Sequence, residues 1–235
     1  MRLILPFLLL SEARAPVRHV RRRERAEASE SRAELLRALA ERDPELHEHT
    51  VDVAVLARRV AGRLGCDGRT RAAISLAAEL HDVGKVAIPD LILRKPGPLD
   101  PDEAELMRMH AEIGAAIVLE SPGLAAAAAL VRASHERWDG GGYPDGLSAQ
   151  EIPEGARIIA VCDAFDAMVS PKSYRRSKTS AEALDELRRC AGTQFDPTLV
   201  EIFCEYVDPQ VGDWAAQRSS TPAGPGAAVP VPVRK

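Results

Sequence analysis

Apolar residues recur at helical spacing along most of the central chain, and no stretch shows the convincing alternation that is typical of strands. In the clearest case, the positions i, i+3, i+4 and i+7 are taken by Ile74, Ala77, Ala78 and His81. An imidazole therefore shares the apolar face of a helix predicted over 70–83, which Gly84 is expected to end. Aromatic residues are only 4% of the 235 residues, which favours helices over sheet and predicts an all-α protein.

Polar and proline residues mark where the other predicted helices begin. Ser31 with Glu34 forms a capping-box pattern that opens a short helix to residue 40, and Thr179 begins a second capping box. Asp100 is expected as an N-cap, because a proline and two acids follow it. The remaining helices are expected at 44–64, 100–119, 123–136, 156–169, 179–190 and 197–206.

The chain divides into three parts by composition. Residues 1–30 mix apolar and basic positions and are expected to be a poorly ordered leader, too short to form a sensor domain. Residues 31–210 carry the helical pattern of one domain, and residues 211–235 are a Pro-, Ala- and Gly-rich tail that we expect to be disordered. The apolar stretch at 3–10 is too short for a membrane span, which needs roughly 20 residues.

Charge and cysteine usage exclude some classes of protein. The net charge is −4 and no basic patch dominates, which argues against binding of a nucleic-acid polymer. The four cysteines are scattered without a CxxC pair, so we interpret them as reduced thiols of a cytoplasmic protein. A homodimer or a signalling protein partner is left open by the sequence.

The adjacent pair His81-Asp82 is the first candidate for chemistry. Neutral imidazole and carboxylate both bind Zn, Fe or Mn, and a carboxylate can bridge two metals. The alternative is a capping histidine and a solvated aspartate at a helix end. Lys85 lies one turn further on, where it could meet a phosphate, although a solvated lysine is the simpler interpretation.

Further ionisable residues fall on faces that should be buried. Glu45 and His49 are four apart on one helix, and His49 continues its apolar face, where histidines are more often core residues than ligands. Asp163 lies among apolar residues, so it should be paired in a salt bridge or bound to a metal. His110 also falls toward a buried side, and His135 precedes a glycine-rich turn.

Taken together, these residues resemble the HD-GYP family, a subgroup of the HD superfamily of metal-dependent phosphohydrolases. The resemblance spans roughly residues 42–207. The matching segments in chain order are Arg42-Asp43-Pro44-Glu45 with His49, His81-Asp82-Val83-Gly84-Lys85, Ile88-Pro89, Lys95-Pro96-Gly97, His110, residues 135–144 with Gly142-Tyr143-Pro144, residues 159–167, and Gln194-Phe195-Asp196-Pro197. One such segment would be a weak signal, whereas all of them in this order are specific.

The resemblance implies an HD-domain helical bundle with an HD-GYP C-terminal extension and two or three divalent metal ions, usually Fe or Mn. It implies hydrolysis of a cyclic dinucleotide, usually cyclic di-GMP, to the linear dinucleotide or GMP by metal-activated hydroxide. The implied metal ligands are Glu45, His49, His81, Asp82, His110, His135 and Asp163, with Glu45 serving a third ion. Asp82 and Lys85 are the implied catalytic residues. The implied substrate contacts are Lys85, Gly142, Tyr143, Pro144, Lys172 and Arg175.

Two departures from the family pattern keep other functions open. Ser134 stands where members often have a second histidine, which removes one metal ligand. Lys172 stands where an arginine is usual, and lysine lacks the planar fork that grips phosphate. The alternatives are a degenerate module that binds a nucleotide or a signalling partner without turnover, and a phosphohydrolase acting on another nucleotide.

Overall fold

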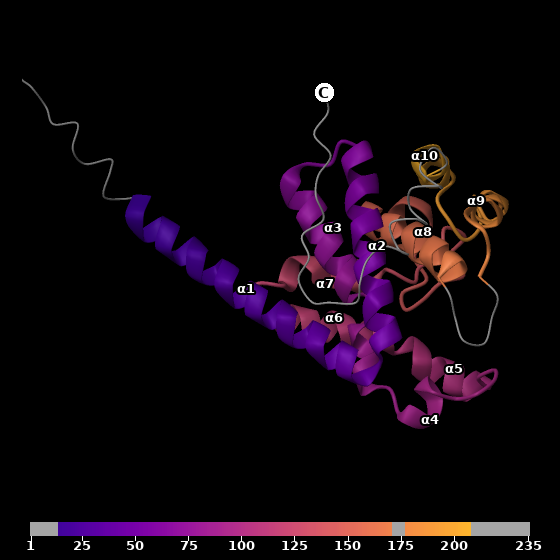
Figure 1. The fold of residues 1–235 in the computed structure, drawn as a ribbon, viewed down its shortest axis with the longest axis horizontal. Helices are drawn as coiled ribbons and strands as arrows, with labels where there is room; N and C mark the ends of the chain where they lie inside the picture. The colour runs from indigo at the N-terminus through magenta and orange to yellow at the C-terminus, as the bar shows by residue number, and fades with distance from the viewer. Residues whose placement is uncertain (1–13, 171–176, 208–235) are drawn as a thin grey trace, which may run out of the picture.

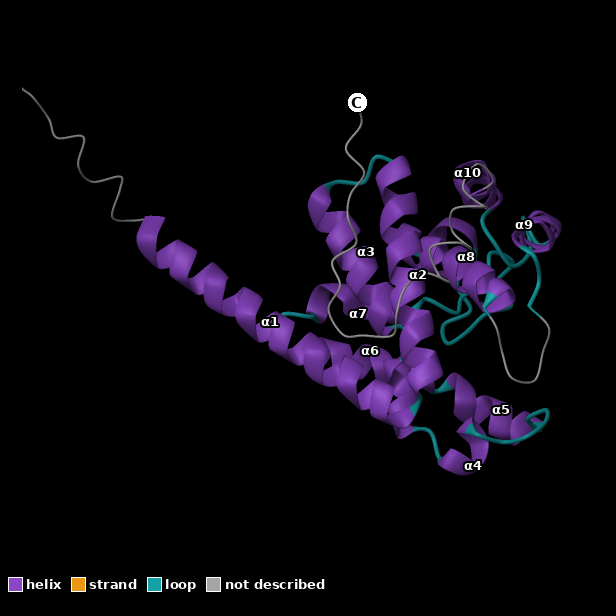
Figure 2. Cartoon of the chain, in the orientation of Figure 1, coloured by secondary structure: helices purple, strands orange, loops and turns teal. Residues whose placement is uncertain are grey.

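The computed structural model describes residues 14–170 and 177–207, with side chains from residue 22 onward. This part of the chain contains helices and loops without a strand, apart from an isolated bridge between Ala191 and Phe195 (Figure 2). The helices are α1 (Arg14–Arg42), α2 (Pro44–Arg63), α3 (Gly68–Leu80), α4 (Asp90–Leu93), α5 (Pro101–Arg108), α6 (His110–Glu120), α7 (Ala128–Arg132), α8 (Glu154–Val169), α9 (Ser180–Arg189) and α10 (Pro197–Val207). Short 3-10 turns occupy η1 (Val83–Ala87), η2 (Ala125–Ala127) and η3 (Ala149–Glu151). The all-α prediction is therefore confirmed.

The core lies where the antiparallel pair α2 and α3 packs against α8, with α9 and α10 covering the far side of α8 (Figure 1). Val53, Ile74 and Phe165 are buried in this core, and each such side chain stabilises the fold by about 1.5–3 kcal/mol. The rings of Phe165 and Phe203 meet edge to face at 5.1 Å, which joins α8 to α10. This packing brings the start of α2 and the end of α3 together beside the middle of α8.

Helix α1 is longer than the sequence analysis expected. Instead of a leader followed by a helix at 31–40, one helix runs from Arg14, and its first half extends away from the bundle (Figure 1). Arg23 pairs with Glu27 one turn on, and Ala28 lies against Gly123 of the body. Ion pairs and good helix formers thus continue the helix where no apolar face is present to predict it. In the described residues, no helix is both long and apolar enough to cross a membrane.

The helix predicted over 70–83 ends earlier, at Leu80, and His81 caps it. Gly84 does not stop the helix but lies buried in η1. A Cβ at Gly84 would come within 2.0 Å of the carbonyl oxygen of His110, so only glycine allows η1 to approach α6 this closely.

Two other predicted helices are also shorter or divided. The helix expected over 100–119 is interrupted at Met109, where the ring of His110 bonds to the carbonyl of Met107. The helix expected over 123–136 ends at Arg132, and an irregular segment follows. The caps at Asp100 and Thr179 lie at the helix starts predicted from them, and each forms a complete capping box. The capping box expected at Ser31 lies inside α1 and opens no helix.

Candidate metal centre

His49, His81 and Asp163 form a first group of ligand atoms that all lie within 4.8 Å of one another. They come from α2, the end of α3 and α8. His49 Nε2 lies 2.8 Å from Asp163 Oδ1, and His81 Nε2 lies 3.8 Å from the same oxygen. His81 donates its Nδ1–H to the carbonyl of Ala78 at 2.8 Å, which leaves the Nε2 lone pair directed into the group. This first group has the donor types that a divalent transition metal prefers.

Asp166 supports the first group from behind. Its Oδ2 lies 2.6 Å from His49 Nδ1, and Ser170 donates a hydrogen bond to the same oxygen at 2.8 Å. Burial alone would lower the pKa of His49, but the bonds to Asp163 and Asp166 raise that pKa to about 9. His49 thus holds a proton between two carboxylates, in the position that a metal cation would take over.

A second group consists of Asp82, His110 and His135, whose ligand atoms also lie within 4.8 Å of one another. They come from the turn after α3, the first residue of α6 and the segment after α7. His110 donates its Nδ1–H to the carbonyl of Met107, and its Nε2 lies 2.8 Å from His135 Nε2. Burial among these side chains lowers the pKa of His135 to about 3, against the attraction of Asp82, so the imidazole is neutral and able to act as a ligand.

Asp82 connects the two groups. Its Oδ2 lies 3.4 Å from His81 Nε2 of the first group, and its Oδ1 lies 3.3 Å from His110 Nε2 of the second. Lys85 Nζ donates to Oδ2 at 2.7 Å. Burial opposes ionisation of Asp82, yet Lys85 and the neighbouring imidazoles hold the pKa of this carboxyl well below its usual value. A buried carboxylate shared between two ligand groups is suited to bridge two metal ions.

Two buried atoms at the centre of the site have no hydrogen-bond partner among the described residues: His81 Nε2 and Asp82 Oδ1. Both side chains are at most 3% exposed. An unpaired buried acceptor costs about 1–3 kcal/mol, so atoms of this kind indicate that a ligand completes the site. Because both atoms accept and neither donates, they fit a cation. The residues present therefore fit divalent metal binding.

The tyrosine of the glycine-rich turn closes one side of the site. Tyr143 stacks on His135 with ring centroids 5.2 Å apart and planes 12° apart. Burial and the charges of Asp82 and Asp163 raise the pKa of Tyr143, so its phenol is neutral. A Cβ at Gly142 would come within 2.3 Å of the backbone nitrogen of Arg137, which explains the glycine before Tyr143.

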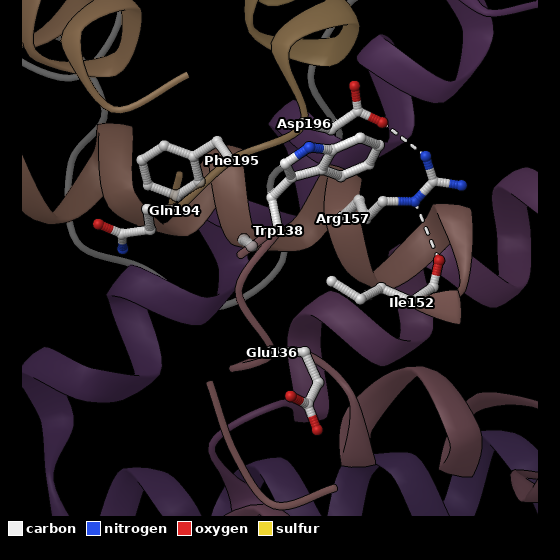
Figure 3. A pocket seen from close by; sticks show the side chains of 8 residues that line it. Glu136, Trp138, Ile152, Arg157, Gln194, Phe195 and Asp196 are labelled. Carbon is white, nitrogen blue, oxygen red and sulfur yellow. Dashed lines mark hydrogen bonds and ion pairs between the residues drawn. The ribbon is translucent and has the colours of Figure 1, made fainter. Parts of the chain in front are cut away.

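A cluster away from the metal ligands holds this turn in place (Figure 3). Arg157 on α8 pairs with Asp196 at 2.5 Å, donates to the carbonyl of Ile152 and lies over the ring of Trp138. The backbone of Trp138 also donates to the carbonyl of Gln194 at 3.1 Å. The small hollow that these side chains line includes none of the residues of the two metal-binding groups. It is a brace for the turn rather than the reaction site.

The structure brings together most of the predicted ligands but not all of them. Glu45 is exposed and belongs to neither group, so its predicted place at a third ion receives no support from the described residues. Ser134 is buried and donates its hydroxyl to the carbonyl of Val131 instead of a metal group. Lys172 and Arg175 lie outside the described residues. Sequence reasoning missed the role of Asp166, although its spacing of three from Asp163 on an apolar helix was a visible signal.

Comparison with known proteins finds relatives for most of the chain. A family model described as an HD domain matches residues 34–199, well over half of the chain. A cyclic di-GMP phosphodiesterase of Thermotoga maritima is 45% identical over 173 residues, which cover 72% of this chain and 47% of the relative. A 3'3'-cGAMP-specific phosphodiesterase 2 of Vibrio cholerae is 38% identical and covers 80% of this chain and 36% of the relative. The chain thus spans half or less of the length of these relatives.

Solved structures show the same fold. The crystal structure of a cyclic GMP-AMP-specific phosphodiesterase from Vibrio cholerae superposes with a TM-score of 0.57 at 21% identity. The match covers 74% of this chain and 49% of the other. This likeness concerns the helical bundle alone.

Proposed function

Because the chain belongs to the HD-GYP family of the HD superfamily, we propose that it is a metal-dependent phosphodiesterase that hydrolyses a cyclic dinucleotide. The substrate that we propose is cyclic di-GMP, with the linear dinucleotide or GMP as product. The names of the two curated relatives support a cyclic dinucleotide as the class of substrate. The observation that carries the proposal is Asp82, one buried carboxylate placed between two groups of metal ligands.

We propose one divalent ion in each group, Fe or Mn, with Asp82 shared between them. His49, His81 and Asp163 would hold the first ion, and His110 and His135 the second. When bound, such ions make water a better nucleophile and neutralise charge on a phosphodiester. Exposed Glu45 is not needed for this pair.

The exposure of the side chains around the two groups indicates from which side a substrate can reach them. The side chains of His81, Asp82 and His110 are at most 3% exposed, whereas those of His135, Lys85 and Asp163 are 17%, 21% and 27% exposed. The substrate should therefore approach from the side of these three. Lys85 places a positive charge beside Asp82, where a phosphate oxygen would arrive, and the ring of Tyr143 offers an apolar wall next to His135.

The test is a product analysis with defined metal content. Protein stripped of metal and then loaded with Mn²⁺ or Fe²⁺ is incubated with cyclic di-GMP, 3'3'-cGAMP and cyclic di-AMP in parallel. We expect cyclic di-GMP to be converted to the linear dinucleotide or GMP only by the loaded protein. Binding of cyclic di-GMP without any product would support a degenerate binding module instead, and turnover of another nucleotide alone would reassign the substrate.

A further inference from the structure

Arg108 is a charged residue beside the metal centre that the site has not yet accounted for. It is the last residue of α5 and lies two positions before the ligand His110. Its guanidinium carbon lies over the ring of Tyr143, 5.8 Å from the centroid, which is within the range of a cation–π contact. Since Tyr143 stacks on His135, the guanidinium is one ring removed from the second group.

Arg108 is a cation near the site whose charge is not paired with a carboxylate of either metal-binding group. Asp82 and Asp163 are anionic members of the two groups, and the ammonium of Lys85 is bonded to Asp82 at 2.7 Å. Arg108 is exposed, and its guanidinium makes no ion pair or hydrogen bond with the residues that the structure describes. Its contact with Tyr143 uses the face of the guanidinium and leaves the N–H donors on the edge free.

A cyclic dinucleotide carries two phosphodiesters, and only one of them can occupy the metal groups at a time. The other keeps its negative charge and needs a partner near the rim of the site. We propose that Arg108 binds this second, uncleaved phosphate while its guanidinium remains stacked on Tyr143. The inference rests on the proposed function and adds a substrate-binding residue to it. Charge-assisted bonds from a guanidinium fork to phosphate are among the stronger contacts that a protein makes.

The chain contains a matched control for this contact. Arg63 lies over the ring of Tyr206 at 5.2 Å, so it makes the same kind of cation–π pair. This pair joins the end of α2 to α10 and includes no residue of either metal group. Arg63→Ala therefore removes an exposed arginine from a tyrosine without touching the site.

The experiment compares two substrates in Mn²⁺-loaded wild type, Arg108→Ala, Arg108→Lys and Arg63→Ala. Bis(p-nitrophenyl) phosphate has a single phosphodiester, whereas cyclic di-GMP has the second phosphate. We expect Arg108→Ala to raise KM for cyclic di-GMP by about tenfold more than for bis(p-nitrophenyl) phosphate. Arg108→Lys should fall between Arg108→Ala and wild type because it keeps charge without the fork. Arg63→Ala should match wild type on both substrates.

Inhibition separates this inference from the proposed function. The inhibition constant of cyclic di-GMP against hydrolysis of bis(p-nitrophenyl) phosphate measures its binding even if it is not cleaved, and metal content is measured in each variant. Equal losses on both substrates, or an unchanged KM and inhibition constant in Arg108→Ala, would overturn the role of Arg108. If wild type hydrolyses bis(p-nitrophenyl) phosphate but neither cleaves nor binds cyclic di-GMP, the proposed substrate is wrong and the inference falls with it.

Discussion

The first and second metal-binding groups contain similar ligands but are supported differently. In the first group, His49 is held by Asp166, a fully buried carboxylate that is itself bonded to Ser170. In the second group, His110 is held by a neutral acceptor, the backbone carbonyl of Met107. The first group draws two of its ligands from the interior of long helices, whereas the second takes all of its ligands from turns or a helix start.

A carboxylate behind a histidine raises its basicity and fixes its orientation, and removing such a partner typically costs 10–100-fold in metal affinity. The difference in support therefore indicates that the first group binds its ion more tightly. Exposure does not rank the two groups, since the side chain of Asp163 in the first group is 27% exposed and that of His135 in the second is 17% exposed, so the ranking rests on the carboxylate behind His49. In the proposed mechanism hydrolysis uses both groups, so the group with the lower metal affinity should limit activity when metal is scarce.

Asp82→Asn should have the largest effect because it removes the charge shared by both groups. We expect turnover to fall by more than about 100-fold and both ions to be held weakly. Metal content after dialysis and turnover are measured, and the circular dichroism spectrum checks that the variant is folded. Asparagine has the same shape as aspartate, so only the charge is lost. A folded variant that keeps full turnover would contradict the bridging role of Asp82.

Asp166→Asn should bring the metal affinity of the first group down toward that of the second. The variant keeps an acceptor near His49 Nδ1 but loses the negative charge, so metal affinity of the first group should drop about 10–100-fold. Calorimetric titration of metal-free protein with Mn²⁺ would resolve the two classes of site in wild type. Titration curves that do not differ between wild type and variant would show that Asp166 does not support the first group.

Gly84→Ala tests the placement of the second group relative to the first. The added Cβ would collide with the carbonyl of His110 and force η1 and α6 apart, lowering the free energy of unfolding by about 1–3 kcal/mol. The second group should bind metal with lower affinity because His110 is displaced. Gly68→Ala is the control, since a Cβ there meets nothing within 4 Å, and it should change stability by less than about 0.5 kcal/mol. Equal denaturation midpoints for both variants would rule out the close-approach argument.

Ser134→Ala should have the smallest effect. Its hydroxyl bonds to the carbonyl of Val131 and not to a ligand group, so we expect a loss of about 1 kcal/mol in stability and no change in metal retention. Urea unfolding and metal per chain are the measurements. Loss of metal in this variant would show that the serine takes part in the second group after all.

The starts of α5 and α9 could be predicted because their signals are local. Asp100 and Thr179 each accept a backbone N–H within the next turn, and this depends only on neighbouring residues. The helix ends near the site could not be predicted, because they depend on contacts with residues that are distant in sequence. Gly84 follows the end of α3 in sequence, but it is required by the close approach of α6, and the start of α1 has no apolar periodicity to reveal it.

The same distinction applies to the site. Six of the residues that the family resemblance implied as ligands lie together in the two groups: His49, His81, Asp82, His110, His135 and Asp163. The partner of Asp166 is 117 residues away in sequence, so spacing alone could not distinguish a local cap from a bond to His49. Glu45 shares a helix with His49 but is exposed and belongs to neither group, so its assignment to a third ion stays a prediction.

The central claim is that two metal-binding groups linked by Asp82 differ in metal affinity. Its most direct test is to follow metal content and turnover together during stepwise dialysis against a chelator. Fully loaded wild-type protein should lose the ion of the second group first, and hydrolysis of cyclic di-GMP should disappear at that step while the ion of the first group is still bound. Asp166→Asn should abolish the separation between the two steps. Turnover that persists after the first ion has left, or that continues in metal-free protein, would contradict the account.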